Sequence, residues 1–347
     1  MRKQFKAGHS GSLSSRSLIE IVVSEIPAKL LSTALELEIF DLLSEPRSAA
    51  QIAQEHGWHL ANTELFLNAL CACGLLHKDE GLFSNTDQTQ TFLSKQGEFY
   101  LGRLFQLSAP FWTSGLERLG DLVRNGPAKI ANEQSMDPDF WQGLATEMAA
   151  GQRAWLSGLA VEKVSALPGA GSYTRMLDLG GGPGMVAIAL ARHFPNLHCV
   201  VFDLPPVTEV AGQFIAQYGL QDRVSTMGGD FNDDELGRDY DLIWASNSLH
   251  FAKADLHGLM GKAYQALKPG GFLLTFHEGL TNQRTAPKEQ VLNGLMTSLQ
   301  SHDLFFDQSE IASAMEAAGF SPIVSRTYDT DWGPFDLDQA RRPMGEK

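Results

Sequence analysis

From residue 173 onward, short apolar segments alternate with helical stretches, and this alternation is the feature that most restricts the fold. The segments are RMLDLGG (175–181), LHCVVFDL (197–204), VSTMGGD (224–230), DLIWASNSLH (241–250) and GFLLTFHEGL (271–280). Apolar strands of this length, separated by helices, predict a mostly parallel, doubly wound sheet that helices cover on both faces. Ligands of such sheets bind beyond the carboxyl ends of the strands, so we expect the functional residues there.

A glycine-rich turn follows the first of these strands. It runs from Asp178 through Gly180, Gly182 and Gly184, and a helical pattern begins directly after it. Glycines permit a tight turn and a close approach of the backbone to a ligand. The dinucleotide fingerprint G-x-G-x-x-G needs a small residue where Met185 stands, so that pattern fails. Asp178 would also repel a pyrophosphate, whereas it would attract the cationic head group of an amino acid.

Aspartates also end the next two strands. Asp203 closes the second strand, where a carboxylate can accept hydrogen bonds from both hydroxyls of a ribose. Asp230 and Phe231 follow the third strand and offer an acceptor and an aromatic face that suit an adenine ring. Each acid alone could be a helix cap or a solvated loop residue, but three successive strand ends with Asp indicate one ligand site. S-adenosylmethionine has a cationic head group, a ribose and an adenine, and it carries no phosphate.

Residues 18–97 have the outline of a winged helix. Helical patterns are followed by LLHKDEGLFSNT (75–86), which predicts two strands joined by a turn. Residues 18–95 carry four basic and eleven acidic side chains, and the helix that would enter a DNA groove, ANTELFLNALCACG (61–74), has no Lys or Arg. Because phosphate contacts supply most nonspecific affinity, this charge argues against duplex binding. The first helix is apolar on much of its circumference, so we predict protein contact in a homodimer.

The chain as a whole is acidic and lacks a membrane-spanning pattern. It carries 27 Lys and Arg against 41 Asp and Glu, a formal charge of −14, which disfavours nucleic acid and anionic membranes as partners. No run reaches the roughly 18 apolar residues of a membrane span. The three cysteines, Cys71, Cys73 and Cys199, are expected to be buried thiols in a reducing cytoplasm. We therefore predict a cytoplasmic protein.

Aromatic side chains are spread through the helical residues 98–170. Such residues are most often plain core, but they could also line an apolar pocket between these helices and the following domain. The predicted substrate pocket comprises Trp112, Phe140, Trp141, Met148, Trp155, Asn247 and Met296. The predicted organisation is a disordered tail (1–17), a winged-helix-like dimerisation domain (18–97), connecting helices (98–170), a cofactor-binding catalytic domain (171–330) and a C-terminal tail (331–347).

Several motifs together resemble a known family. They are MLDLGGGPG, VVFDLPPV, GGDF, NSLHF, YQALKPGGFLLTFHE and AAGF, and the similarity spans about residues 20–325. They look like the class I S-adenosylmethionine-dependent small-molecule O-methyltransferases of the caffeate, acetylserotonin and bacterial polyketide or phenazine type. The resemblance implies an α/β, Rossmann-like catalytic domain preceded by an α-helical winged-helix dimerisation domain. It places the cofactor contacts on Asp178, Gly180, Gly182, Asp203, Asp230, Phe231 and Ser246.

The same resemblance assigns the general base to His250, with Glu278 beside it to hold the imidazole tautomer. A hydroxyl must lose its proton as its oxygen accepts a methyl group, and an imidazole with a pKa of about 6.5 suits that step near neutral pH. His277, the neighbour of Glu278, should point to the opposite face of a regular strand. We predict methyl transfer from S-adenosylmethionine to a hydroxyl of a small aromatic or apolar metabolite.

The chain departs from the family pattern after residue 300. The second flanking Glu of the plant enzymes falls at Phe305, with Asp303 and Asp307 nearby, and HDLFF (302–306) replaces a glycine-rich segment. Methylation of sulfur or carbon in a small metabolite, such as a sulfur-containing acid or a tetrapyrrole-type intermediate, therefore stays open. Such acceptors need less help from a base than an alcohol does.

Two further features bear on function. Asp230, Asp233 and Asp234 form an acidic cluster like that of magnesium-dependent methyltransferases, but the chain otherwise resembles metal-independent enzymes, so we expect a hydrated loop and no metal. A winged-helix regulator that uses the cofactor domain as a sensor is a further alternative, against which the acidic first domain argues. The sequence leaves the identity of the methyl acceptor open.

Overall fold

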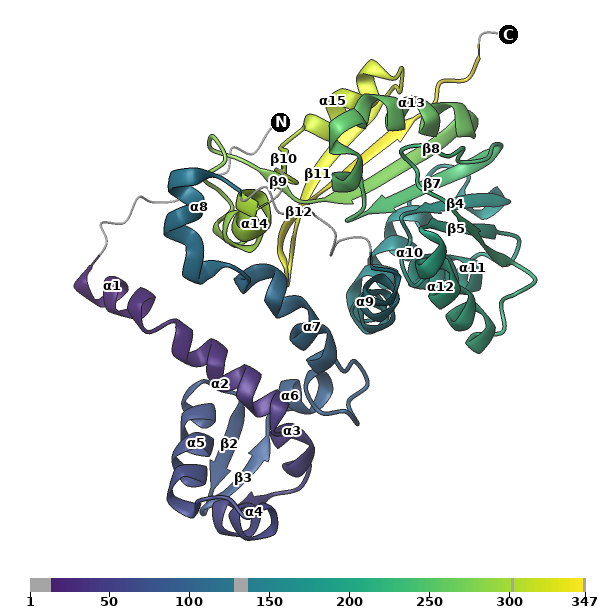
Figure 1. Cartoon of the computed structure of the whole chain (residues 1–347). Coiled ribbons are helices and arrows are strands. Elements are labelled where there is room, and N and C mark those ends of the chain that lie inside the picture. Colours follow the sequence, from purple (N-terminus) through teal and green to yellow (C-terminus); the bar gives the residue numbers. More distant parts are fainter. Residues whose placement is uncertain (1–13, 128–136, 301–302, 346–347) are drawn as a thin grey trace. The chain divides into compact units, whose positions relative to one another are not determined.

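A computed structural model describes residues 14–127, 137–300 and 303–345, without the side chains of residues 110–112. The chain forms two compact units, Met1–Gly102 and Arg103–Lys347, and each is described by itself (Figure 1). The division lies close to the predicted boundary at residue 97. No helix within the described residues is long and apolar enough to cross a membrane.

The first unit consists of short helices around a small sheet. Its helices are α1 (Ser15–Val22), α2 (Glu25–Glu36), α3 (Ile39–Leu42), α4 (Ala49–His56), α5 (Leu60–Ala72) and α6 (Asp87–Phe92), and its strands are β1 (Arg47–Ser48), β2 (Leu76–Asp79) and β3 (Leu82–Asn85). The strands are antiparallel in the order β1-β3-β2. Glu80 and Gly81 adopt φ values of 44° and 84°, which closes the turn between β2 and β3. The predicted arrangement of helices followed by a hairpin is confirmed.

Two expectations for this unit need correction. Ser14 caps α1 by accepting a hydrogen bond from the Ser17 amide at 3.1 Å, so residues 15–17 are helical, while residues 1–13 lie outside the described part of the chain. Cys71 is partly exposed and Cys73 is exposed, and only Cys199 is buried. The buried face of α5 carries Leu67 and Leu70, and the two cysteines lie off that face at the end of the helix.

A seven-stranded sheet forms the centre of the second unit. Its strands are β4 (Arg175–Leu179), β5 (His198–Asp203), β6 (Val224–Gly228), β7 (Tyr240–Ser246), β8 (Leu267–His277), β11 (Ile323–Thr330) and β12 (Gly333–Arg341), in the order β11-β12-β8-β7-β4-β5-β6. The neighbours from β8 to β6 pair in parallel, and β12 pairs antiparallel with both β8 and β11. The predicted mostly parallel sheet is confirmed.

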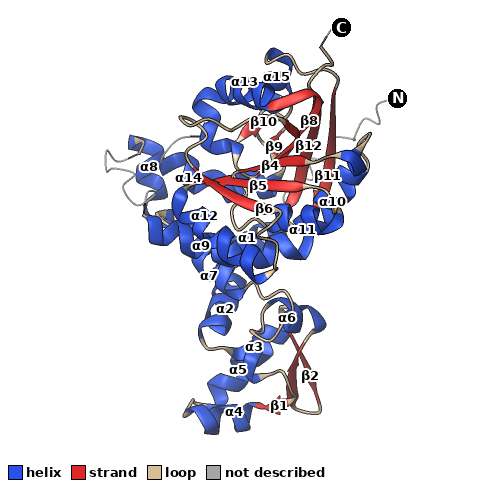
Figure 2. Ribbon diagram, turned by 90° about the vertical axis from the view of Figure 1, so that its right-hand side faces the viewer, coloured by secondary structure: helices blue, strands red, loops and turns tan. Residues whose placement is uncertain are grey.

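Helices cover this sheet on both faces, as Figure 2 shows by the blue helices around the red strands. The first apolar core contains Trp244 and Phe276 together with side chains of α10 (Ser157–Ser165) and α11 (Met185–His193). The second core contains Ile243 and Leu273 together with side chains of α13 (Leu256–Ala266) and α15 (Glu310–Ala317). Adjacent strand residues alternate between the two cores because successive side chains of a strand point to opposite faces.

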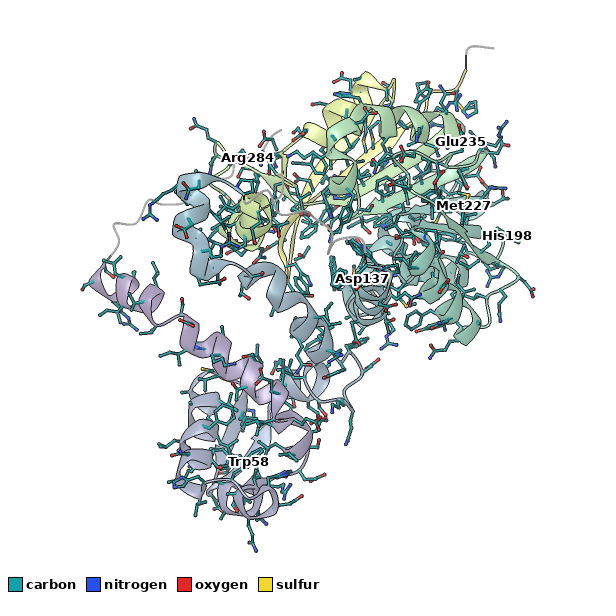
Figure 3. All side chains as sticks on the ribbon, in the orientation of Figure 1. Trp58, Asp137, His198, Met227, Glu235 and Arg284 are labelled. Atoms are coloured by element: carbon teal, nitrogen blue, oxygen red, sulfur yellow. The ribbon has the colours of Figure 1, made fainter. Side chains whose placement is uncertain are left out.

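The remaining elements lie around the sheet. They are α7 (Gly102–Thr113), η1 (Leu116–Arg118), α8 (Leu119–Asn125), α9 (Pro138–Gly151), η3 (Gln152–Leu156), η4 (Ala170–Ser172), α12 (Pro205–Gln217), η5 (Leu249–Asp255), β9 (Gly279–Leu280), α14 (Lys288–Gln300) and β10 (Phe306–Asp307). Asp137, labelled in Figure 3, begins α9 because its carboxylate accepts a hydrogen bond from the Asp139 amide at 3.0 Å. The expected helical character of residues 98–170 holds for the described part of that segment.

The predicted C-terminal tail is wrong, because residues 333–341 form strand β12 inside the sheet. This strand pairs over its length with β11 and also with β8. Phe335 and Leu337 are buried in the first core, and Ala340 is buried in the second. Apolar residues alternate with Asp336 and Asp338 here, and the charged positions conceal the strand pattern in the sequence. The sheet of the catalytic domain therefore extends beyond residue 330.

Candidate active site

The glycine turn after β4 has a backbone that only glycine adopts easily. Gly180, Gly182 and Gly184 have φ values of 66°, 58° and 76°. A Cβ atom on Gly180 would lie 2.3 Å from Cβ of Ser248, so this glycine is packed tightly under the end of β7. A Cβ on Gly182 would have only the Gln152 side chain within 4 Å, with Nε2 at 3.4 Å. Other side chains therefore pack tightly against the turn at Gly180, whereas the turn is open at Gly182.

Asp178 lies beneath the turn. Its side chain is 2% exposed, and Oδ2 accepts a hydrogen bond from the Ala187 amide of α11 at 3.2 Å. Burial raises the pKa of Asp178 to about 7, although the hydrogen bond from Ala187 opposes that shift, and the charge of Asp203 raises it further. The carboxylate thus supports the turn from below and does not stand at its open mouth.

Asp203 connects the ends of β5 and β4. Its Oδ2 accepts a hydrogen bond from the Gly182 amide at 2.8 Å, and its Oδ1 accepts one from the Leu204 amide at 2.8 Å. Burial raises the pKa of Asp203, while these two hydrogen bonds lower it. The structure therefore brings together the second predicted acid and the open glycine of the turn.

Three further predicted cofactor residues lie near strand ends. Asp230 and Phe231 follow β6, and Ser246 ends β7. Phe231 is buried, and its Cε1 would lie 3.6 Å from a Cβ on Gly180, so its ring borders the glycine turn. Asp230 accepts hydrogen bonds from the amide and the side chain of Asn232, both at 2.9 Å. Ser246 ends β7, and its hydroxyl accepts a hydrogen bond from the Trp244 indole at 3.1 Å. Phe231 thus lies against the turn, while the polar groups of Asp230 and Ser246 are engaged locally.

The acidic residues after β6 are tied to one another by their backbone. The Asp230 amide donates to Oδ2 of Asp234 at 2.8 Å, and the Asp233 amide donates to the Asp230 carbonyl at 3.0 Å. Across residues 14–127, 137–300 and 303–345, no three His, Cys, Asp or Glu side chains are grouped as ligands for a metal ion.

His250 follows β7 on the short helix η5, where an aromatic cluster adjoins it. The ring of Phe251 lies 4.1 Å from that of His250, and Trp141 meets Phe251 edge-to-face at 5.7 Å. Phe140 in turn lies 5.4 Å from Trp141. We call Phe140, Trp141 and Phe251 the aromatic ledge. It joins two predicted pocket residues of α9 to the predicted base through Phe251, which is 49% exposed and which the sequence analysis missed.

The end of β8 places His277 and Glu278 in different surroundings. His277 is 2% exposed, and its ring meets that of Phe306 edge-to-face at 6.1 Å. Burial lowers the pKa of His277 well below its usual value, and the charge of His250 lowers it further. Burial raises the pKa of Glu278. The charge of His250 thus acts on His277, and the role of Glu278 beside the base stays a prediction.

The segment that departs from the family pattern packs beside Glu278. Strands β9 and β10 pair in parallel with Phe306 opposite Gly279, so Phe305 and Glu278 each come directly before the paired residues. The Phe305 ring covers Gly294 of α14 so closely that a Cβ there would lie 1.4 Å from Cε2 of Phe305. Phe305 thus places an apolar ring at the position where the plant enzymes of the family have a second flanking Glu.

The two acids near Phe305 are neutralised by ion pairs. Asp303 pairs with Lys253 at 2.9 Å and with Arg284 at 2.6 Å, and Asp307 pairs with Arg284 at 2.8 Å. Burial would raise the pKa of Asp303, but the hydrogen bond from Lys253 and the neighbouring positive charges bring it below its usual value. These ion pairs thus tie Asp303 and Asp307 to η5 and to the loop after β9.

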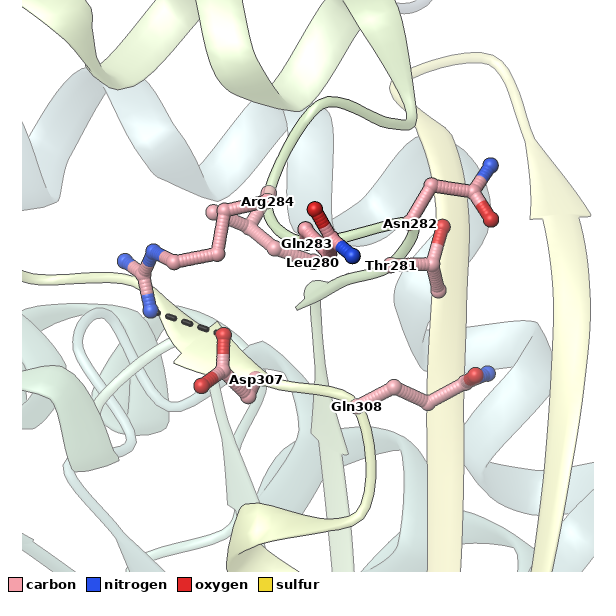
Figure 4. A pocket seen from close by; sticks show the side chains of 7 residues that line it. All are labelled: Leu280, Thr281, Asn282, Gln283, Arg284, Asp307 and Gln308. Atoms are coloured by element: carbon pink, nitrogen blue, oxygen red, sulfur yellow. Dashed lines mark hydrogen bonds and ion pairs between the residues drawn. The ribbon is translucent and has the colours of Figure 1, made fainter.

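A cavity of about 470 Å³ lies at the loop after β9. Its lining residues are Leu280, Thr281, Asn282, Gln283, Arg284, Asp307 and Gln308 (Figure 4). Figure 4 shows the Arg284–Asp307 ion pair across one side of it. The cavity contains none of the predicted site residues, and its lining is mostly polar, so it does not correspond to the predicted apolar pocket.

The remaining pocket residues have diverse surroundings. Trp155 packs in the first core, 6.0 Å from Phe276 and 6.3 Å from Phe335, and Met296 is buried in α14. Asn247 is exposed in left-handed backbone with φ of 51°, and Met148 lies partly buried in α9. Trp112 belongs to α7, but its side chain lies outside the described residues. The structure gathers the aromatic ledge beside His250, and it gives Trp155 a core role.

Gln152 is a further candidate that the sequence analysis missed. It begins η3, a π-helical turn, and π-helical turns occur frequently at functional sites. Its Oε1 atom is buried without a hydrogen-bond partner, while its Nε2 atom lies near Gly182. An unsatisfied buried oxygen costs stability unless a ligand supplies a donor. We call Gly182, Asp203, Phe231 and Gln152 the cradle. These residues fit a ligand with amino, ribose and adenine groups.

Known families match both units of the chain. A model of the O-methyltransferase domain matches residues 140–321, which is more than half of the chain. A model of the O-methyltransferase dimerisation domain matches residues 24–95.

Individual proteins match nearly the whole length. The tetracenomycin polyketide synthesis 8-O-methyl transferase of Streptomyces glaucescens is 26% identical over 94% of this chain and 96% of its own. An N,N-dimethyltransferase of Streptomyces rimosus is 26% identical over 92% of this chain and 95% of its own. The solved structure of human N-acetylserotonin methyltransferase in complex with S-adenosylmethionine has the same fold, with a TM-score of 0.79 and 22% identity over 97% of this chain and 100% of that one.

Proposed function

This chain belongs to the O-methyltransferase family and uses S-adenosylmethionine as its cofactor, and from that premise we propose that His250 is the general base for methylation of a hydroxyl on a small aromatic or apolar metabolite. The observation that carries the proposal is the position of His250 beside the aromatic ledge, at the carboxyl end of the sheet next to the glycine turn. The proposal therefore joins a proton acceptor and a flat apolar surface in one site.

The cradle at the glycine turn supports the cofactor half of the proposal. Asp203 would receive the ribose hydroxyls, Phe231 would lie along the adenine, and Gly182 with Gln152 would border the amino-acid end of the cofactor. When bound, S-adenosylmethionine supplies a methyl group attached to a positively charged sulfur. Asp178 and Asp203 favour such a positive ligand, because burial raises the pKa of both carboxyls and a nearby cation would restore their charged forms.

The aromatic ledge supports the nature of the acceptor. The half-exposed Phe251 offers a ring surface beside His250, and Trp141 holds that ring edge-to-face. A flat acceptor gains contact area and favourable ring geometry on such a surface. His250 would then lie next to the hydroxyl of the acceptor and take its proton as the oxygen is methylated. Alignment of the acceptor in a site with little water supplies the rest of the rate enhancement.

Apolar side chains on the first two helices support a homodimer. Leu18, Ile19, Ile21, Val22 and Ile26 are all at least half exposed, with Val22 at 80%. An exposed apolar surface of this kind marks a contact with another chain, and a second copy can cover it with the same surface. The match of residues 24–95 to a dimerisation domain agrees with this role.

A His250→Ala variant tests the proposed base. We expect kcat to fall by about 100-fold or more, because general-base catalysis contributes about that much. The affinity for S-adenosylhomocysteine, measured by calorimetry, should stay within about twofold. His257→Ala is the matched control, because His257 is exposed on the neighbouring helix α13. Full activity of His250→Ala toward a hydroxyl acceptor would remove His250 from the mechanism.

A second candidate function is methylation of an acceptor atom other than a hydroxyl oxygen, and the position of Phe305 favours it. An apolar ring packs where a second acid would assist the base, and one relative methylates nitrogen according to its name. A neutral amine or a thioether is nucleophilic enough to attack the methyl group without first losing a proton, so it depends less on a base than an alcohol does. Mass spectrometry of the product identifies the methylated atom. Turnover that does not depend on pH between 5 and 8 would favour this alternative.

A further inference from the structure

His277 is a buried histidine at the end of β8 that the proposed reaction does not use. It is 2% exposed, and its Nε2 atom is buried without a hydrogen-bond partner. Buried polar atoms are usually satisfied, so an orphaned imidazole nitrogen in a core calls for an explanation. The Phe306 ring that borders His277 can offer no hydrogen bond to a ring nitrogen.

Contacts of η5 and of the segment before it hold this part of the chain beside the end of β8. In a 3₁₀ helix, residues three apart lie on the same face, so His250 shares its face with Lys253. The ammonium of Lys253 lies 5.5 Å from the centroid of Phe306, which is the same ring that borders His277. The Asn247 amide also donates to the Phe276 carbonyl at 3.2 Å and so fixes the segment before η5 against the end of β8.

Charged groups near His277 are already engaged. Asp336 of β12 lies opposite His277 in the antiparallel ladder and shares its face, and its carboxylate accepts a hydrogen bond from the Thr327 hydroxyl. Lys253 pairs with Asp303. Glu278 follows His277 directly and belongs to the alternate face of the strand. Because burial and the charge of His250 both lower the pKa of His277, its imidazole stays neutral.

Resting on the proposed role of His250, we propose that His277 is a positioning residue for that base, whose neutral imidazole accepts a hydrogen bond from the protonated His250 ring. The proton of the acceptor hydroxyl would pass to His250, an electron pair of the hydroxyl oxygen would form the new bond to the methyl carbon, and the pair of the broken carbon–sulfur bond would stay on sulfur. His277 keeps its own proton and contributes only a nitrogen lone pair. The pair thus carries one positive charge at most, as two imidazoles in a buried setting require.

Variants of His277 test this role. His277→Phe removes the acceptor, so we expect kcat to fall by about 10- to 100-fold, the usual effect of a hydrogen bond to a charged group. The acidic limb of the kcat/KM profile should move to lower pH by about one unit, because the imidazolium of His250 loses its partner. His277→Gln keeps an acceptor oxygen and should recover most of the activity. Affinity for S-adenosylhomocysteine should stay unchanged in both variants.

Thr275→Val is the matched control, because Thr275 is a buried residue two positions earlier on the same strand face, with its own hydroxyl unpaired. It should keep the wild-type profile. If His277→Phe retains the kcat and the acidic limb while His250→Ala is inactive, the role of His277 is wrong and the proposed base stands. If His250→Ala is active, the proposed base itself fails.

A measurement on the unaltered chain covers the case in which His277→Phe does not fold. Nitrogen NMR of the labelled histidine rings between pH 5 and 9 should show His277 neutral throughout, with an Nε2 shift that follows the titration of His250. In His250→Ala that dependence should vanish. A His277 signal that ignores the protonation of His250 would overturn the proposal.

Discussion

The two halves of the site are built in different ways. The cofactor half, at the ends of β4, β5 and β6, is made mainly of backbone, with left-handed glycines, amides that bond Asp203, and one aromatic ring. The proposed acceptor half, at the ends of β7 and β8, consists of side chains that come from α9, η5, β8 and β10. A backbone cradle tolerates little change, whereas a side-chain pocket can be refilled to suit another acceptor. Phe305, where the chain departs from the family pattern, lies in the acceptor half.

The largest effect should come from Gly180, because its contacts are the tightest in the cofactor half. In Gly180→Ala the new Cβ would lie 2.3 Å from Ser248 in a backbone with φ of 66°. We expect the free energy of unfolding to fall by about 1–3 kcal/mol and binding of S-adenosylhomocysteine to be lost. Thermal melting and calorimetry measure the two effects.

Gly212→Ala serves as its control, because a Cβ there would meet nothing within 4 Å on helix α12. That variant should melt at or above the temperature of the unaltered chain, since alanine favours a helix. Normal cofactor affinity in Gly180→Ala would show that the turn yields more readily than its packing indicates.

A smaller effect on cofactor binding should come from the charge of Asp178, although its effect on stability is of similar size. Burial raises the pKa of the Asp178 carboxyl from its ordinary value of 3.8 to about 7 in the folded protein. It therefore contributes stability that is complete below about pH 4 and is lost as the pH rises through 7. Asp178→Asn should remove that loss and stabilise the cofactor-free protein at pH 8 by about 2–4 kcal/mol, while weakening the cofactor. Urea unfolding at pH 5 and pH 8 gives the difference.

Asp338 provides the comparison from outside the site. It is buried on β12, and burial raises its pKa to about 6. Asp338→Asn should flatten the dependence of stability on pH in the same direction but leave cofactor affinity unchanged. Equal loss of cofactor binding in both variants would mean that the effect of Asp178 is structural rather than electrostatic.

The smallest effect should come from the acceptor half. Phe251→Ala removes the exposed ring of the aromatic ledge, and we expect the KM for an aromatic acceptor to rise by about tenfold, as the loss of one ring contact predicts. The affinity for S-adenosylhomocysteine should not change, and initial rates at varied acceptor concentration give the KM. Leu292→Ala is the control, because Leu292 is an exposed apolar side chain on α14. A change in the affinity of Phe251→Ala for S-adenosylhomocysteine would contradict the separation of the site into a cofactor half and an acceptor half.

Much of the fold could be predicted because its signals are local. The alternation of apolar strands with helices predicted the sheet, and the glycines after Asp178 predicted the tight turn. The strand β12 was missed because Asp336 and Asp338 occupy alternate positions, and Asp338 is buried by pairing with β8, which is distant in the sequence. Gln152 was missed because no local pattern distinguishes a glutamine beside a ligand from one on a helix surface.

By itself, the sequence determined the parallel sheet, the glycine turn and the acids at the strand ends, since periodicity and backbone freedom are properties of neighbouring residues. Only the tertiary structure decided which side chains meet. It placed Asp178 beneath the turn, joined Phe251 to Trp141, and buried His277 at the end of β8. Such meetings depend on packing between distant segments, and the free energy of a buried group depends on all its neighbours at once.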